Sequence, residues 1–163
     1  MDADISQLSI EPEWPREDRR AAVKKAVGYL SRREHSACEL SRKLERSGFD
    51  GSLVGHVMSE LQAHGLQSDC RFAEAYVRYR GSRGFGPARI HKELADKGVS
   101  SALVEEVMAG SGWDWYVQAA SVRTKKFGDN RPEDYKERAR QARFLQYRGF
   151  AGEQINYALG GED

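Results

Sequence analysis

Arginine is the residue type in this sequence whose spacing is best suited to chemistry, because arginines recur at the breaks between amphipathic segments. Arg32 and Arg33 are adjacent in one such break, and a glycine-rich stretch, residues 81–86, contains Arg83 and lies between Arg80 and Arg89. A guanidinium group carries five N–H donors in a planar fork that matches phosphate and carboxylate oxygens. These positions therefore predict contact with a polyanion or an acidic protein surface. The alternative at each of them is a solvated basic turn.

The last third of the chain is also basic. From Arg123 to Arg148 there are nine lysines and arginines against four acidic residues, and the stretch includes Lys125, Lys126 and Arg143. Such a stretch can be an ordinary charged helix face. The excess of one sign favours an anionic partner.

Residues that would carry catalysis or bind a metal show no useful spacing. The two cysteines, Cys38 and Cys70, form no CxxC motif, and the histidines are scattered at positions 35, 56, 64 and 91. The glycine-rich stretch lacks the GxxxxGK[ST] pattern of a phosphate-binding loop, and no strand is predicted before it. We therefore expect no catalytic residues, no metal and no cofactor.

The elements that must position the arginines are helices arranged in an internal repeat. One string of landmarks recurs about every 50 residues, and Gln141 takes the first apolar place in the third copy. The strings are Leu40, Leu44, Gly48, Phe49, Val54, Val57 and Met58, then Ile90, Leu94, Gly98, Val99, Val104, Val107 and Met108, then Leu145, Gly149, Phe150, Ile155, Ala158 and Leu159. The apolar spacing is helical, so the sequence predicts an all-α fold of three tandem three-helix repeats in an elongated, curved array.

Local signals place the helix ends. Gly48, Gly98 and Gly149 stand where a left-handed residue would end a helix. Helix starts are predicted at Ser36, Asp50, Pro87, Ser100 and Pro132. Phe72, Tyr76 and Tyr79 are predicted to face the core of the second repeat rather than to stack on bases. The expected organisation is a mobile acidic leader at 1–19 and repeats at 20–66, 68–110 and 112–160.

Charge and composition indicate the cellular compartment in which the protein works. The 163 residues carry a formal charge of +1, but the first fifteen hold four acidic residues and no basic one, so the remainder is near +5. No apolar run approaches the roughly 20 residues that span a bilayer. The sparse, separated cysteines favour a reducing compartment. We expect a cytoplasmic protein without membrane contact.

Three ordered stretches together resemble the RecX family. They are YLSRREHSACELSRKL with the following GF, GLQSDCRFAEAYVRYRGSRGFGPARIHKEL with KGV, and RARQARFLQYRGF with the downstream Ile155. The resemblance runs from about residue 21 to 159. It implies a non-enzymatic array of three-helix repeats that lies in the groove of a RecA filament on DNA. Such a groove ligand need not self-associate, so we expect a monomer. It also implies limited filament growth or promoted disassembly, with reduced recombinase, ATPase and coprotease activity.

The contact surface is a hypothesis drawn from the turns and the basic third repeat. Its candidate residues are Arg32, Arg33, Arg80, Arg83, Arg89, Arg143 and Arg148. The alternative function is a helix-turn-helix DNA-binding regulator. Segments 53–64 and 103–109, which would read bases, are poor in Arg, Lys, Asn and Gln. Weak DNA contact that is independent of sequence and sensitive to salt would be compatible with regulation of RecA.

Overall fold

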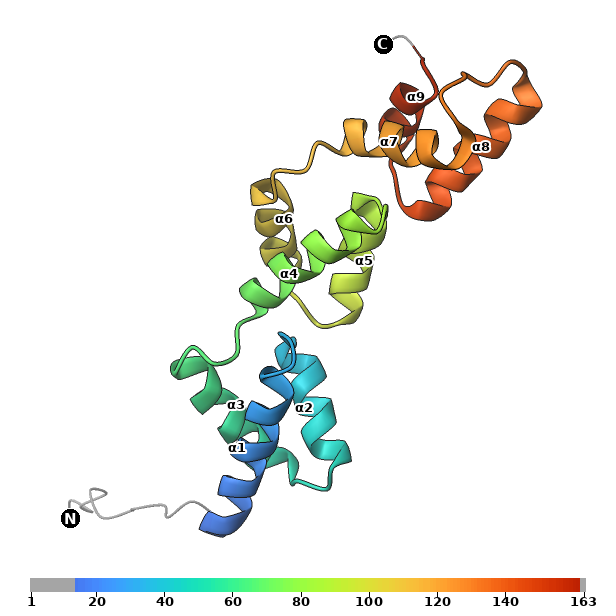
Figure 1. Ribbon diagram of the computed structural model, residues 1–163. Helices are drawn as coiled ribbons and strands as arrows, with labels where there is room; N and C mark the ends of the chain where they lie inside the picture. Colours follow the sequence, from blue (N-terminus) through green and yellow to red (C-terminus); the bar gives the residue numbers. More distant parts are fainter. Residues whose placement is uncertain (1–13, 162–163) are drawn as a thin grey trace, which may run out of the picture. The chain divides into compact units, whose positions relative to one another are not determined.

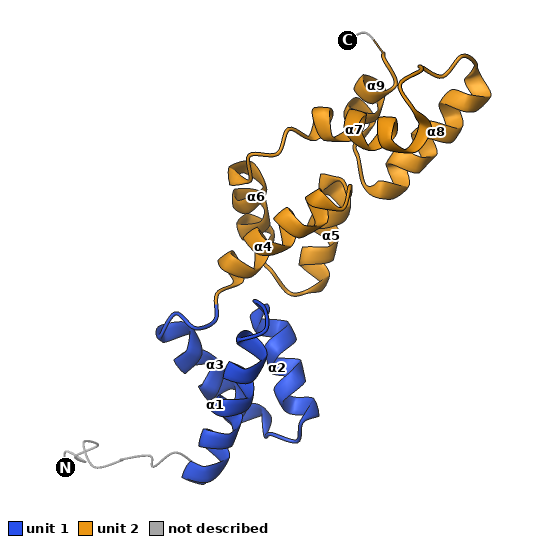
Figure 2. Cartoon of the chain, in the orientation of Figure 1, with its two compact units in different colours: residues 1–67 blue, residues 68–163 orange. Residues whose placement is uncertain are grey.

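The computed structural model describes residues 14–161, and over this range the chain forms nine α-helices and no strand (Figure 1). It divides into two compact units, residues 1–67 and 68–163 (Figure 2). The first helix begins at Arg16, so residues 16–19 of the expected leader are helical. Residues 1–13 of that leader lie outside the described residues.

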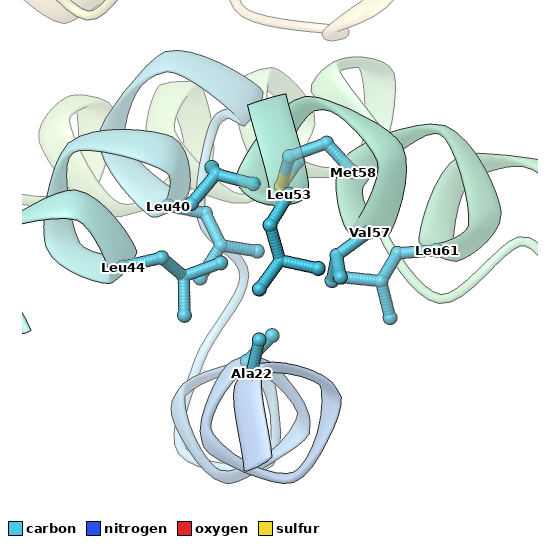
Figure 3. Packing of buried hydrophobic residues seen from close by; sticks show 9 residues of the cluster. Ala22, Leu40, Leu44, Leu53, Val57, Met58 and Leu61 are labelled. Carbon is cyan, nitrogen blue, oxygen red and sulfur yellow. The ribbon is translucent and has the colours of Figure 1, made fainter. Parts of the chain in front are cut away.

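The first unit is one three-helix repeat of α1 (Arg16–Leu30), α2 (Ala37–Arg46) and α3 (Gly51–Ala63). Each helix contributes apolar side chains at helical spacing, and these point toward one another in a single core (Figure 3). Ala22 of α1 and Leu40 and Leu44 of α2 are fully buried there. Trp14 packs against the same core and donates from its indole Nε1 to Ser52 Oγ at 3.2 Å.

The second unit contains two further repeats. The helices of one are α4 (Asp69–Ser82), α5 (Pro87–Asp96) and α6 (Ser101–Gly110), and those of the other are α7 (Trp115–Phe127), α8 (Tyr135–Arg148) and α9 (Gly152–Ala158). Each of the two repeats has its own cluster of buried apolar residues. The predicted all-α fold of three three-helix repeats is confirmed.

The helix ends follow the predicted signals with one exception. Gly48, Gly98 and Gly149 have φ values of +96°, +80° and +98°, which a residue with a Cβ adopts only under strain. Ser36, Asp50 and Ser100 cap α2, α3 and α6 through their side-chain oxygens, and Pro87 occupies the first turn of α5. The prediction for Pro132 is wrong. Helix α8 begins three residues later, where Asp134 accepts from the Glu137 N–H at 2.8 Å.

The third repeat has a polar pair in its core. Arg123 lies nine residues after its N-cap, as Val77 does in the second repeat, and Gln141 lies eight residues before its terminal glycine, as Ile90 does. Both polar side chains are buried, and Arg123 Nη1 donates to Gln141 Oε1 at 3.3 Å. The same guanidinium donates to two backbone carbonyls, those of residues 129 and 130, in the turn between α7 and α8. The pair therefore replaces an apolar contact with one that also secures this turn.

Helix ends also join the two repeats of the second unit. At the start of α5, the N–H groups of Gly86 and Ala88 donate to the carbonyls of Arg148 and Gly149 at 2.8 and 3.0 Å, at the end of α8. A Cβ on Gly86 would lie 2.5 Å from the Gly149 carbonyl, and one on Gly149 would collide with Arg89 Cβ. Only glycines allow this approach, which brings the glycine-rich loop against α8.

Candidate functional site

Three of the seven candidate arginines meet around one aromatic ring, and a fourth is joined to them by a hydrogen bond. The guanidinium carbons of Arg80, Arg89 and Arg148 lie 3.7, 4.7 and 4.9 Å from the centroid of Phe85. Arg83 joins them through its backbone carbonyl, which accepts from Arg148 Nη1 at 3.1 Å. We call these four residues the arginine cluster. Helix ends from two repeats bring its members together, although up to 68 positions separate them in the sequence.

Glu93 fixes two members of the arginine cluster. Arg80 donates to both of its carboxylate oxygens, at 2.8 and 2.6 Å, and Arg89 Nε donates at 3.0 Å. The Tyr76 hydroxyl donates at 2.8 Å. Burial would raise the pKa of Glu93, but these hydrogen bonds outweigh it and hold the pKa at about 2. Burial and the hydrogen bond to the carboxylate raise the pKa of Tyr76 to about 12.

Arg83 and Arg148 are the members available to an outside anion. Among residues 14–161, neither guanidinium forms an ion pair with a carboxylate. Arg148 is half-buried and held between the rings of Phe85 and Phe144, while Arg83 is exposed and lies 5.4 Å from the centroid of Tyr79. Arg80 and Arg89 therefore shape the arginine cluster, and the other two supply unneutralised charge.

A depression of about 260 Å³ adjoins the arginine cluster. Arg83 and Arg148 line it, together with Lys125 and Lys126 from the last turn of α7. Ser121 adds a hydroxyl group. We call this the junction depression, since the second and third repeats both contribute to it. The basic character of residues 123–148 pointed to the two lysines, but their meeting with Arg83 is a tertiary effect.

The remaining three candidate arginines are not members of the arginine cluster. Arg143 of α8 lines a different groove, with apolar side chains of α8 and α9. Arg33, in the first unit, pairs with Glu39 at 2.6 Å. Arg32 is exposed beside Lys24 and Lys25 of α1. Within the second unit, the structure thus gathers four of the five candidate arginines and places Arg143 apart from them, while Arg32 and Arg33 belong to the first unit.

One aromatic prediction is wrong. Phe72 is buried and Tyr76 is half-buried, but Tyr79 is 54% exposed. The buried face of α4 instead continues from Ala73 to Val77, four residues apart. Tyr79 therefore presents its ring to solvent next to Arg83.

The described part of the chain offers no grouping of three or more histidine, cysteine or acidic side chains suited to a metal ion. Cys38 and Cys70 are free thiols. None of the helices between residues 14 and 161 combines the length and apolarity needed to cross a bilayer.

Comparison with known proteins places the three repeats in order. Family models described as the first, second and third three-helix domains of RecX match residues 22–61, 68–108 and 114–159. The chain belongs to the RecX family. The regulatory protein RecX of Halorhodospira halophila is 44% identical over 138 residues, covering 85% of this chain and 86% of its own. That of Pseudomonas entomophila is 40% identical over 147 residues, covering 90% and 95%.

Solved RecX structures have the same fold. The crystal structure of RecX from Lactobacillus salivarius superposes with a TM-score of 0.74 at 18% identity, covering 88% of this chain and 95% of that one. A second crystal structure, of a regulatory protein RecX, gives 0.72 at 18% identity over 87% and 71%. The relatives are named as regulatory proteins, and no catalytic function is indicated for the family by those names.

Proposed function

We propose that this chain regulates RecA by binding in the groove of the RecA–DNA filament. The observation that carries the proposal is the ordered match of all three repeats to the RecX family. Binding in the groove would block filament extension or promote disassembly, and so lower recombinase, ATPase and coprotease activity. No chemical step by this chain is needed for such an effect.

The arginine cluster supports this proposal because it offers a surface for an anionic partner. Arg83 and Arg148 carry charge that no carboxylate of residues 14–161 neutralises in an ion pair, and Glu93 keeps their neighbours Arg80 and Arg89 in place. Guanidinium groups fixed in this way bind anionic oxygens at a reduced entropic cost. Because a filament repeats its subunits, weak contacts from several repeats of one chain would add through avidity. Arg32, Arg33 and Arg143 remain candidates for such additional contacts.

The test is ATP hydrolysis by RecA on single-stranded DNA, with this protein titrated from substoichiometric amounts. We expect hydrolysis to fall when only a few molecules of this protein are present per filament. Each bound chain would either block extension at a filament end or cause several RecA subunits to dissociate. Unchanged hydrolysis at equimolar protein would contradict the proposal. Light scattering in the same buffer checks the proposed monomeric state.

The contact is tested by reversing the charge of Arg83 and Arg148 together. We expect the Arg83→Glu, Arg148→Glu variant to need roughly tenfold more protein for half inhibition, a loss of about 1.4 kcal/mol, which is below the roughly 2–5 kcal/mol typical of a fully buried charge pair because Arg83 is exposed. The matched control is Arg78→Glu with Lys92→Glu, two exposed cations of α4 and α5 outside the arginine cluster. Equal potency of the two variants would remove the arginine cluster from the proposal.

A helix-turn-helix DNA-binding regulator is the alternative. Helix α6 exposes Glu105 and Glu106, and adjacent carboxylates are repelled by the phosphates that line a major groove. This observation favours the RecA proposal. Tight binding to bare duplex DNA, without any effect on RecA, would instead favour the alternative.

A further inference from the structure

The junction depression has properties that contact with a filament protein does not require. We infer that it binds the phosphate backbone of single-stranded nucleic acid, with Tyr79 stacking on a base, and that it does so without RecA. This assigns a direct nucleic-acid contact to the chain. It is tested separately from the RecA proposal, because the measurement contains no RecA.

Unbalanced charge is the first argument. Four cations, Arg83, Lys125, Lys126 and Arg148, line one depression of about 260 Å³. Over residues 14–161, none of the four is engaged in an ion pair. Like charges gathered in a concavity raise the local potential and attract polyanions. All four cations stand at helix C-termini, where the helix dipole favours positive charge: Lys125 and Lys126 in the last turn of α7, Arg148 in the last turn of α8, and Arg83 at the C-cap of α4. The dipoles account for each position separately, but not for the meeting of three helix ends at one depression.

The donors in the junction depression suit phosphate oxygens. The ammonium groups of Lys125 and Lys126 are exposed at the end of α7, and Ser121 lies one turn before them. Arg148 uses one nitrogen on the Arg83 carbonyl and keeps its charge at the edge of the depression. Lysine, arginine and serine are among the side chains that contact nucleic-acid phosphates.

An exposed aromatic ring distinguishes a single strand from a duplex. Tyr79 is 54% exposed, and its ring centroid lies 5.4 Å from the guanidinium carbon of Arg83. The two residues thus present a π face next to a cation that lines the junction depression. Single strands bind where a basic groove follows the backbone and aromatic rings stack on unpaired bases. A duplex keeps its bases stacked and gains nothing from Tyr79.

The test is fluorescence anisotropy of a labelled oligothymidylate of about 20 nucleotides, titrated with the full chain at low salt. The variant is Arg83→Gln, Lys125→Gln and Lys126→Gln, three exposed residues whose side chains donate none of the described hydrogen bonds. The control variant neutralises three other exposed cations of the second unit, at Arg78, Lys92 and Lys136. Circular dichroism of each variant confirms that the helices are retained.

We expect the first variant to bind roughly tenfold more weakly than the parent and the control to bind like the parent. The slope of log affinity against log salt should fall by roughly 0.7 for each phosphate that the variant no longer neutralises. Tyr79→Ser should weaken binding roughly fivefold or more without changing that slope.

Three outcomes would overturn the inference. Equal affinity of the depression variant and the control would show that the charge of the junction depression is not used. Equal or tighter binding of a duplex of the same length would exclude a single-strand site. Displacement of the oligonucleotide by a polyglutamate of matched charge, at equal or lower concentration, would assign the depression to an acidic protein segment instead.

Discussion

A neutral imidazole is buried in the turn between α1 and α2. His35 is 2% exposed, its Nδ1 lies 3.0 Å from the Arg33 carbonyl, and its Nε2 lies 2.9 Å from Lys43 Nζ. Since an ammonium group can only donate, Nε2 accepts and Nδ1 carries the proton. Burial lowers the pKa of His35, and the charges of Arg33 and Lys43 add to this, against Glu39 and the hydrogen bond to the Arg33 carbonyl. The surroundings of His35 in this turn therefore stabilise its neutral form.

The first prediction follows from that lowered pKa. In the unfolded chain the ring protonates near pH 6.5, before it does so in the folded protein. The free energy of unfolding of the first unit should therefore decrease as the pH falls below about 6.5. Urea unfolding between about pH 7.5 and 5.5, monitored at probes in residues 14–67, measures this. His35→Gln should reduce the pH dependence of the unfolding free energy. If that pH dependence were the same in this variant, other titrating groups would be its source.

The second prediction concerns Glu93, whose pKa is about 2 in the folded chain against an ordinary 4.5. A lowered carboxyl pKa stabilises the fold above pH 4.5 and loses that contribution as the pH falls toward 2. The pKa difference corresponds to about 3.5 kcal/mol, at about 1.4 kcal/mol per pKa unit. Because the Glu93 side chain is 22% exposed and solvent screens part of this, we expect Glu93→Gln at neutral pH to lower the free energy of unfolding of the second unit by about 2–3 kcal/mol. Urea unfolding compares it with Glu105→Gln on exposed α6. Similar losses of unfolding free energy in both variants would mean that the charge of the Glu93 carboxylate contributes little to stability.

At the scale of elements, the contact between the start of α5 and the end of α8 sets the position of the arginine cluster. The N–H groups of Gly86 and Ala88 donate to the carbonyls of Arg148 and Gly149 there. N–H groups left unpaired at the start of α5 thus bond to carbonyls left unpaired at the end of α8. The positive end of one helix dipole also faces the negative end of the other. Both Arg89 and Arg148 stand within one turn of this contact.

The third prediction tests this contact with Gly86→Ala. The added Cβ would lie 2.5 Å from the backbone of Gly149, so the two helix ends must separate. We expect the second unit to lose about 1–3 kcal/mol of unfolding free energy, as overpacked sites do. Gly110→Ala is the control, because its Cβ would meet nothing within 4 Å. It should be neutral or slightly stabilising in a helix. If Gly86→Ala changed the unfolding free energy no more than Gly110→Ala does, the two helix ends would be able to separate at little cost.

How much the sequence could predict varies between elements. Spacing of apolar residues and capping side chains is local information, and it was sufficient for α2, α3, α5 and α6. For α8 two local signals compete, since Pro132 suits a first helical turn and Asp134 with Glu137 suits an N-cap, and the structure uses the second. The exposure of Tyr79 and the hydrogen-bond partners of Glu93 could not be predicted from the sequence. Helical spacing alone does not decide between neighbouring apolar stripes, and contacts between repeats depend on packing.

At the scale of the whole molecule, the described chain has separate cores in separate repeats. Leu44 is fully buried in the core of the first unit, and the cores of the second unit are made only of residues beyond 68. Stability in repeat proteins is a sum of repeat and interface contributions. The two units can therefore respond separately to a change in one core.

The fourth prediction uses Leu44→Ala. Removing this side chain should cost the first unit about 2–5 kcal/mol. Hydrogen exchange should show faster amide exchange across α1, α2 and α3, with little change in residues 68–161. Leu94→Ala, the equivalent position in α5, should give the reverse pattern. Faster exchange throughout the chain in both variants would contradict separate units.

The buried pair of Arg123 and Gln141 limits how freely the repeats can be exchanged as modules. In the second repeat the equivalent places hold Val77 and Ile90. A chimera with α5 in place of α8 would set an aliphatic side chain beside the guanidinium of Arg123 and leave a buried cation short of an acceptor. The reciprocal chimera would bury the Gln141 amide against valine. Repeats with one shared backbone plan are thus not interchangeable parts, and a graft between them succeeds only if both partners of the pair move together.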